Sequence, residues 1–336
     1  MKKIITLFKT IPMLSMMKLF KDWKSFVRFH YLHAAYESGL IEKCSTAVLK
    51  EELFKTIGSK RPDLLEALIN MGIALKEIKV KNNIYSLKGR RSKMLLGEEG
   101  DKFAAWIQAH VNYYNSAYCD FDKRLKGAPD GDYLEVFGAL IARASKMLDP
   151  LVNVFIERVM ESDKELKVLE AGCGSGIYLK KACEVNSKLS GIAIDYDEAV
   201  VKQARNNLSI WGIKNFEVKL GNLSKLDSSF NNKFDIVTMY SMLYYFPVEK
   251  RLELLKKVKS YLKKDGKLIL VSTEQGKKPD IGCANLDIIM RSSRGCYEAP
   301  FYGEIDELLK EAGYQIEHKE SIFPGDTLYG YVAKKN

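Results

Sequence analysis

Gly172, Gly174 and Gly176 follow, at alternate positions, an apolar run that contains Glu170 near its end. Glycine has no Cβ, so the backbone N–H groups of such a loop can lie close to a ligand. The apolar run is typical of a buried parallel strand, and a helix is expected to begin near Ile177. The positive end of that helix would face the loop. We therefore expect an anionic or zwitterionic ligand to bind here.

Two common nucleotide-binding loops do not fit this glycine-rich segment. A P-loop has Lys followed by Ser or Thr after its last glycine, where this chain has Ile177 and Tyr178. The dinucleotide-binding pattern G-x-G-x-x-G would require a glycine at position 177. The pattern that remains is E-x-G-x-G-x-G. Taken alone, it also fits a tight strand-to-helix turn that binds nothing.

The strands predicted after the loop place further polar residues at one edge of a sheet. Segment 191–195 ends in Asp195, about twenty residues beyond the loop, where a carboxylate can accept hydrogen bonds from both ribose hydroxyls of an adenosine. Segment 215–221 is followed by Asn222, and segment 234–241 contains Tyr240. A turn and a fifth strand over 267–271 come next.

From 166 to 272 this order of strands, loop and helices resembles the class I S-adenosylmethionine-dependent methyltransferases. The resemblance implies an α/β fold with a Rossmann-like, seven-stranded core, and S-adenosylmethionine as the cofactor. Asn222 stands where the family usually has an Asp that meets the adenine amino group, and its amide oxygen can accept the same hydrogen bond. The residues implied for donor binding are Glu170, Gly172, Gly174, Asp195, Tyr196, Asn222, Leu223 and Tyr240.

The N-terminal part of the chain predicts three helices and a hairpin, an order typical of a mostly α-helical winged-helix domain. The helices are expected over 20–39, 48–57 and 61–72, and the paired strands over 75–80 and 84–87. Winged helices often bind DNA, so nucleic acid is the rival partner. The third helix, however, presents Asp63 and Glu66, which would repel phosphate.

A winged helix, a helical connector and a methyltransferase core, in this order, resemble the plant-type and bacterial small-molecule O-methyltransferases. That family includes caffeate, hydroxyindole and polyketide methylating enzymes. The resemblance implies a homodimer held by the first domain and a small acceptor that is aromatic or polyketide-like. The expected divisions are an amphipathic arm over 1–25, the winged helix over 26–97, the connector and pocket roof over 98–160, and the donor-binding domain over 161–336.

The catalytic position departs from that family. Plant-type members carry a catalytic histidine in an L-H-D-W sequence, whereas this chain has Tyr244 in the sequence Leu-Tyr-Tyr-Phe. A phenol with a pKa of about 10 is a poor base at neutral pH. Three explanations stay open: His110 of the connector is the base, the acceptor is acidic or an amine and needs none, or Tyr244 only orients the acceptor. N- or C-methylation, and a regulatory protein that binds S-adenosylmethionine without catalysis, are further alternatives.

Other residues are implied for the acceptor pocket. Tyr114 belongs to an aromatic stretch of the connector, and Tyr245 follows the catalytic position. The helix that contains Asn285 and Met290 falls where the family has a D-L-N-M-L helix lining the acceptor, with its polar positions, Asn285 and Asp287, in swapped order. An aromatic stretch also fits ordinary core packing.

Charge and motifs count against a nucleic-acid substrate. The formal net charge of +10 on 336 residues is concentrated in segments 1–28 and 76–93, which hold seven basic residues each. This excess is local: contact of these two segments with an acidic partner is one interpretation, and solvated surface charge is the one that we favour. The [DN]-P-P-[YF] sequence of amino-methylating DNA enzymes does not follow the fourth strand. An RNA methyltransferase that uses the winged helix for binding remains the alternative enzyme.

The remaining sequence features indicate a cytoplasmic protein without a metal site. Six cysteines show no C-x-x-C pair, which is typical of reduced thiols in the cytoplasm. His30 and His33 lack the further ligands that zinc requires. No apolar run is long enough to cross a membrane, and we expect the N-terminal arm to touch a membrane surface at most weakly.

Overall fold

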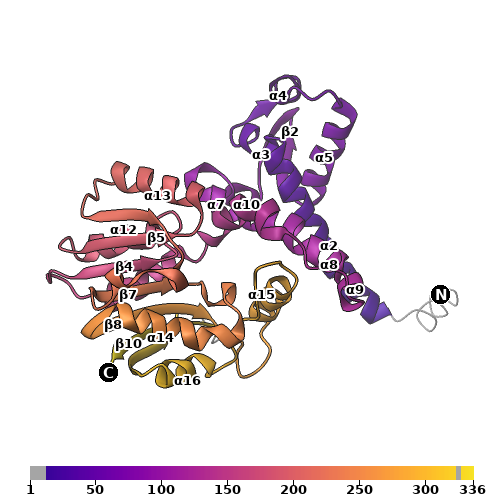
Figure 1. Ribbon diagram of the computed structural model, residues 1–336. Coiled ribbons are helices and arrows are strands. Elements are labelled where there is room, and N and C mark those ends of the chain that lie inside the picture. Colours follow the sequence, from indigo (N-terminus) through magenta and orange to yellow (C-terminus); the bar gives the residue numbers. More distant parts are fainter. Residues whose placement is uncertain (1–12, 323–326) are drawn as a thin grey trace. The chain divides into compact units, whose positions relative to one another are not determined.

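The computed structural model describes residues 13–322 and 327–336, and the chain forms two compact units. The first unit comprises the chain up to Cys119 together with Glu135–Met147. The second comprises Asp120–Leu134 and Leu148–Asn336. The segment expected as a connector, 98–160, is thus divided between the two units. The large sheet belongs wholly to the second unit (Figure 1). The expected arm over 1–25 lies partly outside the described residues.

In the first unit, helices and a small sheet enclose one apolar core. Its early elements are α2 (Met13–Glu37), α3 (Leu40–Lys43), β1 (Val48–Leu49), α4 (Lys50–Ile57), α5 (Pro62–Ala74), β2 (Ile78–Lys81), β3 (Ile84–Leu87) and α6 (Arg90–Met94). The predicted order of helices and hairpin is present. Asn82 and Asn83 join the hairpin with φ values of 51° and 61°, which asparagine tolerates in a two-residue turn.

Two predicted boundaries in this unit are wrong. Val48–Leu49 is a short strand that pairs with β3, because Leu49 is extended and the Val48 side chain is buried on the sheet. Gly72 does not end the third helix, which continues to Ala74. A Cβ at Gly72 would lie 2.3 Å from the Tyr31 hydroxyl oxygen, so glycine there permits close contact with α2.

The rest of the first unit is helical. It consists of α7 (Gly97–Ala109), the π-helical turn η1 (His110–Tyr114), α8 (Asn115–Cys119) and most of α10 (Tyr133–Ser145). Arg143 of α10 forms an ion pair with Asp101 of α7, and its guanidinium also lies 3.3 Å from the Gln108 side-chain oxygen. These contacts attach α10 to α7.

The second unit contains the predicted seven-stranded sheet, in the order β6-β5-β4-β7-β8-β10-β9. The strands are β4 (Lys167–Ala171), β5 (Ser190–Asp195), β6 (Phe216–Leu220), β7 (Phe234–Tyr240), β8 (Leu262–Thr273), β9 (Tyr314–Ser321) and β10 (Leu328–Lys335). The first five are parallel, and β10 is antiparallel to both of its neighbours. This arrangement confirms the predicted Rossmann-like α/β core.

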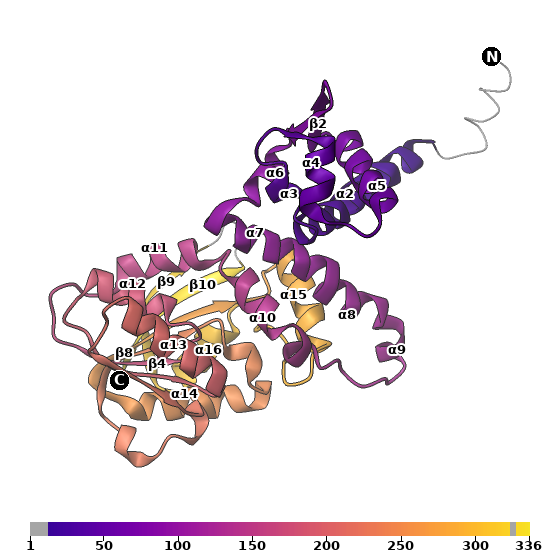
Figure 2. The same cartoon turned by 90° about the horizontal axis from the view of Figure 1, so that it is seen from above.

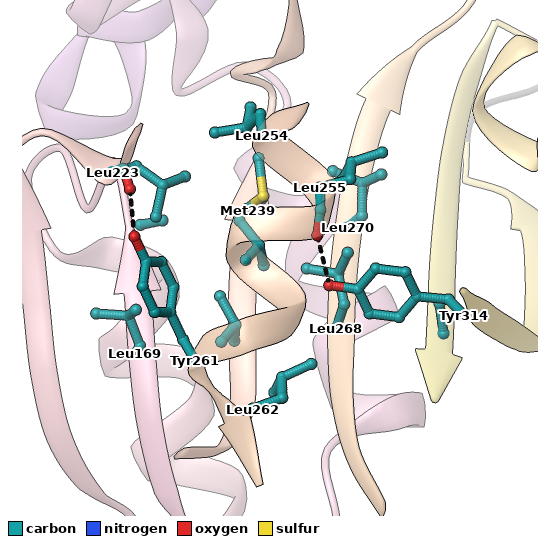
Figure 3. Close-up of a cluster of buried hydrophobic side chains, with 14 of the residues drawn as sticks. Leu169, Leu223, Met239, Leu254, Leu255, Tyr261, Leu262, Leu268, Leu270 and Tyr314 are labelled. Atoms are coloured by element: carbon teal, nitrogen blue, oxygen red, sulfur yellow. Dashed lines mark hydrogen bonds between the residues drawn. The ribbon is translucent and has the colours of Figure 1, made fainter. Parts of the chain in front are cut away.

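Helices cover both faces of this sheet (Figures 1 and 2). One face carries α11 (Asp149–Val159), α12 (Ile177–Val185) and α13 (Glu198–Ile210), and the other carries α14 (Arg251–Tyr261) and α16 (Glu304–Glu311). Figure 3 shows the core on the α14 side, where the hydroxyls of Tyr261 and Tyr314 donate to the carbonyls of Leu223 and Leu255 at 2.8 and 3.2 Å. The buried phenols therefore keep hydrogen-bond partners.

The chain order places a topological switch point at one edge of the sheet. β4 connects through α12 to β5 on one side, whereas β7, which lies beside β4, connects through α14 to β8 on the other. Because the two connections diverge, the carboxyl ends of β4 and β7 border the position where ligands bind in open α/β sheets. The strand ends are level, since Ala171 pairs with both Ile194 and Met239.

Candidate functional site

Three left-handed glycines shape the loop between β4 and α12. Gly172, Gly174 and Gly176 have φ values of 65°, 53° and 80°, which residues with side chains rarely adopt. No atom lies within 4 Å of a Cβ placed on Gly174, whereas one on Gly176 would come 2.7 Å from Leu208. The loop is therefore open at its middle and packed at its end. Gly176 is also the N-cap of α12, so the first turn of the helix suits an anionic group.

Asp195 ties this loop to the end of β5. Its Oδ2 accepts the N–H of Gly174 at 3.1 Å, and its Oδ1 accepts the N–H of Asp197 at 3.2 Å. The N–H of Cys173 donates to the Ile194 carbonyl at 2.9 Å. Asp195 is only 9% exposed, yet each carboxylate oxygen retains a second lone pair. The carboxylate can thus hold the loop and still accept a ribose hydroxyl.

The loop after β6 lies beside Asp195, because the next N–H after the strand, that of Gly221, donates to the Asp195 carbonyl at 2.8 Å. Asn222 is exposed, and its Oδ1 accepts the N–H of Ser224 at 3.0 Å. This oxygen therefore has one lone pair left for an adenine amino group. Leu223 is buried, whereas Tyr196, directly after Asp195, is 71% exposed.

The structure buries Glu170 beneath α12, away from the open part of the loop. Glu170 pairs with Thr238 across β4 and β7, and Tyr240 points to the same sheet face. Glu170 Oε1 has no hydrogen-bond partner among the described residues. Burial raises the pKa of Glu170 to about 8, although the Leu179 N–H donates a hydrogen bond to it. The carboxyl is therefore mainly protonated at neutral pH.

Tyr240 packs under the loop through its ring. The rings of Tyr240 and Tyr178 meet edge to face at a centroid distance of 5.0 Å. Tyr240 is buried, and this burial raises the pKa of its hydroxyl well above the ordinary value. Tyr240 is thus a neutral phenol whose ring packs against Tyr178 of α12, two residues after Gly176. The sequence pattern did not identify Tyr178 as part of the site.

The chain turns sharply after β7. Ser241 has a φ of 52°, a left-handed value that is unusual for a non-glycine residue, and its N–H donates to the Val271 carbonyl at 2.7 Å. The turn places Met242 against the glycine loop, because a Cβ at Gly172 would lie 3.2 Å from Met242 Cε. Nothing in the pattern of residue types signals either role.

Two tyrosines follow this turn. Tyr244 and Tyr245 lie in the short helical turn η4 (Leu243–Tyr245), with ring centroids 4.8 Å apart. The N–H of Tyr297 donates to the Tyr244 carbonyl at 2.8 Å. The segment that contains Tyr297 therefore helps to fix the backbone at the position where the plant-type enzymes have their catalytic histidine.

The predicted acceptor-lining helix is α15 (Ile281–Arg291), which is capped by the Asp280 side chain. Asp287 accepts the N–H of Ala299 at 3.0 Å and forms an ion pair with Arg291, so its carboxylate holds the following loop. Asn285 is half-buried and Met290 is 5% exposed. The two polar positions of the helix therefore differ: Asp287 is committed to structure, whereas Asn285 is partly accessible.

His110 and Tyr114 belong to the first unit, and Tyr244 belongs to the second. The His110 Nδ1 lies 2.8 Å from the Trp106 carbonyl oxygen, and the imidazole stacks on Tyr114 with centroids 4.4 Å apart. Burial lowers the pKa of His110, so its ring is neutral at pH 7. In the neutral tautomer whose Nδ1–H donates to the Trp106 carbonyl, Nε2 carries no proton and can accept a hydrogen bond.

In the described ranges, 13–322 and 327–336, no group of three or more His, Cys, Asp or Glu residues is arranged to hold a metal ion. The six cysteines are all unpaired. A search of the same ranges for a helix long and apolar enough to span a bilayer returns none.

Comparison with known proteins links the second unit to one domain family. Residues 162–313 match the pattern of a methyltransferase domain. A carboxy-S-adenosyl-L-methionine synthase of Nautilia profundicola is 28% identical over 139 residues, which cover 41% of this chain and 57% of that protein. The chain therefore spans little more than half the length of this curated relative.

Solved structures are similar to nearly the whole chain. A mitomycin 7-O-methyltransferase superposes with a TM-score of 0.79 at 13% identity, covering 97% of this chain and 99% of that one. An SAH-bound methyltransferase of calicheamicin biosynthesis superposes with a TM-score of 0.72 at 14% identity, covering 97% and 100%. These similarities extend over nearly the whole chain and confirm the predicted fold class.

We expect the substitution Glu170→Gln to remove a pH dependence of stability. The folded pKa of about 8 exceeds the ordinary value of 4.5, so the stabilisation from the buried acid is complete below pH 4.5 and is lost as the pH rises to about 8. At pH 8 the variant should have the larger free energy of unfolding, by on the order of 3 kcal/mol. Urea unfolding at both pH values measures this difference.

The matched control is Glu249→Gln, which removes an exposed carboxylate from the same unit. It should leave the pH profile of the wild type unchanged. If the wild type and Glu170→Gln kept a constant difference between pH 4.5 and 8, Glu170 would not be a buried, protonated acid.

Proposed function

We propose that the chain, whose residues 162–313 match a methyltransferase domain, transfers the methyl group of S-adenosylmethionine to a small-molecule acceptor. The observation that carries the proposal is the glycine loop, which is held open by the bond from the Gly174 N–H to Asp195 at the carboxyl edge of the parallel sheet.

The residues at this edge fit the donor from end to end. The open backbone at Gly174 and the first turn of α12 suit its amino-acid end. The free lone pairs of Asp195 suit the ribose hydroxyls, and the remaining lone pair of Asn222 suits the adenine amino group. S-adenosylmethionine supplies the reactive methyl group, and the chain's task is to align it with the acceptor and exclude water.

On the acceptor side we place Tyr244, Tyr245 and Asn285. Two tyrosine rings at 4.8 Å offer faces for an aromatic or polyketide-like molecule. The mitomycin and calicheamicin methyltransferases, to which the fold is similar, are named for acceptor pathways of natural-product type. Met290, which is buried, would limit the depth of the pocket.

Proton removal is assigned to a group other than Tyr244. Phenols, whose ordinary pKa is about 10, seldom act as bases at neutral pH, whereas a phenol readily donates or accepts a hydrogen bond that orients an acceptor. We therefore propose O-methylation with Tyr244 as the orienting residue. A phenolate or amine acceptor would need no base from the protein. N- and C-methylation are distinguished by the acceptor assay below.

The nucleic-acid alternative has less support from the first unit. On α5, Asp63 is paired with Arg61, and Glu66 with Lys50. The neighbouring Leu64 is 61% exposed. The exposed acids of this helix surface are ion-paired, and Asn70 is an exposed side chain that could donate to a base edge.

We further propose that the protein is a homodimer formed through α2. Large apolar side chains on this helix are more than half exposed: Met17, Leu19, Phe20, Trp23 and Phe26. A cavity of about 290 Å³ between α2 and the segment that begins at His110 continues this surface. Such a contiguous apolar surface is typical of a protein–protein interface.

The substitution Asp195→Ala should weaken binding of S-adenosylmethionine by about ten- to a hundredfold, because it removes a charged hydrogen bond and releases Gly174. Equilibrium dialysis with labelled donor measures the dissociation constant. Asp227→Ala is the control, since that exposed carboxylate also accepts a backbone N–H but lies outside the proposed site. Equal affinities of Asp195→Ala and the wild type would remove Asp195 from the donor site.

The substitution Tyr244→Phe should lower kcat/KM by about tenfold or less and leave its pH dependence unchanged, because only one orienting hydrogen bond is lost. Transfer of tritiated methyl groups from S-adenosylmethionine to a panel of phenols and aromatic amines, measured over a range of pH, gives kcat/KM and its pH dependence. A loss of about a hundredfold or more, together with a lost pH limb, would instead identify Tyr244 as the base.

The substitution Trp23→Glu should convert the dimer into a monomer, because the new charge would be buried in the apolar contact. Light scattering after size-exclusion chromatography gives the mass. Lys24→Glu, which changes an exposed neighbour, should remain dimeric. A monomeric wild type at micromolar concentration, or a dimeric Trp23→Glu, would reject α2 as the interface.

A further inference from the structure

The hairpin of the first unit and the helix that follows it carry an uncompensated positive charge. Between residues 76 and 93 all seven basic side chains are exposed: Lys76, Lys79, Lys81, Lys88, Arg90, Arg91 and Lys93. The single acid in this stretch, Glu77, is 2% exposed and lies 3.4 Å from Arg28 and 4.0 Å from Arg91. The other six cations have no ion-pair partner among the described residues. We call residues 76–93, together with β1, the basic wing.

The register of the small sheet places apolar side chains among these cations. Leu49 of β1 pairs with Ile84 of β3, and Ile84 pairs with Lys81 of β2. Directly paired residues point to the same side of a sheet, and Lys79 joins them because it is two residues from Lys81. Leu49 and Ile84 are 52% and 41% exposed. The outer face of the basic wing is thus an apolar pair beside two lysines.

The opposite face of the same sheet shows that the core does not require Leu49 and Ile84. Val48 and Tyr85 pair on the inner face, where Val48 is buried and Tyr85 packs against the core of the unit. The core therefore already has its apolar layer. Leu49 and Ile84 are additional apolar residues on the solvent side, and Leu49 lies on the edge strand β1, where a charged side chain such as lysine is the usual choice.

We propose that the basic wing binds the surface of an anionic lipid membrane. Apolar side chains at the centre would enter the boundary between headgroups and acyl chains, while the lysine ammonium groups would lie among the anionic headgroups. Each lysine near such a surface contributes to binding, and the contribution falls with added salt. In Figure 2 the β2 label marks the hairpin at the periphery of its unit, where it is accessible.

Nucleic acid is the other polyanion that could meet seven cations, and the residues favour lipid. A winged helix that binds a duplex uses its third helix and its wing together. Here α5 presents Leu64 and paired charges, as described above. An exposed Leu–Ile pair has no partner on a phosphate backbone, whereas it has one in a bilayer.

The test is sedimentation of the full-length protein with lipid vesicles at low and high salt. Vesicles of phosphatidylcholine alone are compared with vesicles that contain phosphatidylserine, and RNA of mixed sequence is tested by mobility shift under the same conditions. The variants are Lys79→Glu/Lys81→Glu and Ile84→Ser. The charge-matched control is Lys202→Glu/Lys214→Glu, which changes two exposed lysines of the second unit.

We expect binding to phosphatidylserine vesicles that salt weakens. The double charge reversal in the wing should reduce it by at least about tenfold, because each lysine contributes on the order of one kcal/mol. Ile84→Ser should reduce it by a smaller factor at both salt concentrations, and the control should bind like the wild type. Thermal melts that match the wild type exclude misfolding of the variants.

Three results would overturn the proposal. These are equal binding to neutral and anionic vesicles, equal loss in the control and wing variants, and tight binding of RNA without binding of vesicles. Donor affinity is measured in parallel, and none of these outcomes depends on it.

Discussion

The hydrogen bond from the Gly174 N–H to Asp195 Oδ2, at 3.1 Å, is the contact on which the proposed site depends. It joins the loop after β4 to the end of β5, and it can form only because three glycines adopt left-handed φ values. The parallel sheet supplies the level strand ends, and the β4 and β7 connections diverge at this edge, where open α/β sheets bind ligands. The N–H of Cys173, which donates to the Ile194 carbonyl at 2.9 Å, is a second tie between the loop and β5.

The parallel strands, the glycine loop and Asp195 could be predicted from the sequence because each has a local signal. Apolar runs mark buried strands, glycines mark the turn, and an acid at a strand end marks a ribose partner. Helix ends were less predictable. Gly58 ends α4 with a φ of 64°, as expected, whereas Gly72 lies inside α5, where it makes room for Tyr31. Sequence alone does not distinguish a glycine that ends a helix from one that permits contact.

The orientation of side chains around the site could not be predicted. Glu170 has the sequence position of a donor contact, but its carboxyl faces α12 because alternate residues of β4 point to opposite faces. Ser241 and Met242 complete the edge through a strained turn that no residue pattern signals. His110 was expected in a connector that roofs the pocket, but it belongs to the first unit. Its ring packs between those of Trp106 and Tyr114. These outcomes depend on tertiary packing.

The central claim is that the edge formed by the glycine loop and Asp195 binds the methyl donor. Isothermal titration of the unmodified protein with S-adenosylhomocysteine, and separately with NAD, tests it most directly, because both ligands contain adenosine and only the first has an amino-acid end. We predict saturable one-to-one binding of S-adenosylhomocysteine and far weaker binding of NAD. Absence of heat with S-adenosylhomocysteine, or tighter binding of NAD, would contradict the assignment.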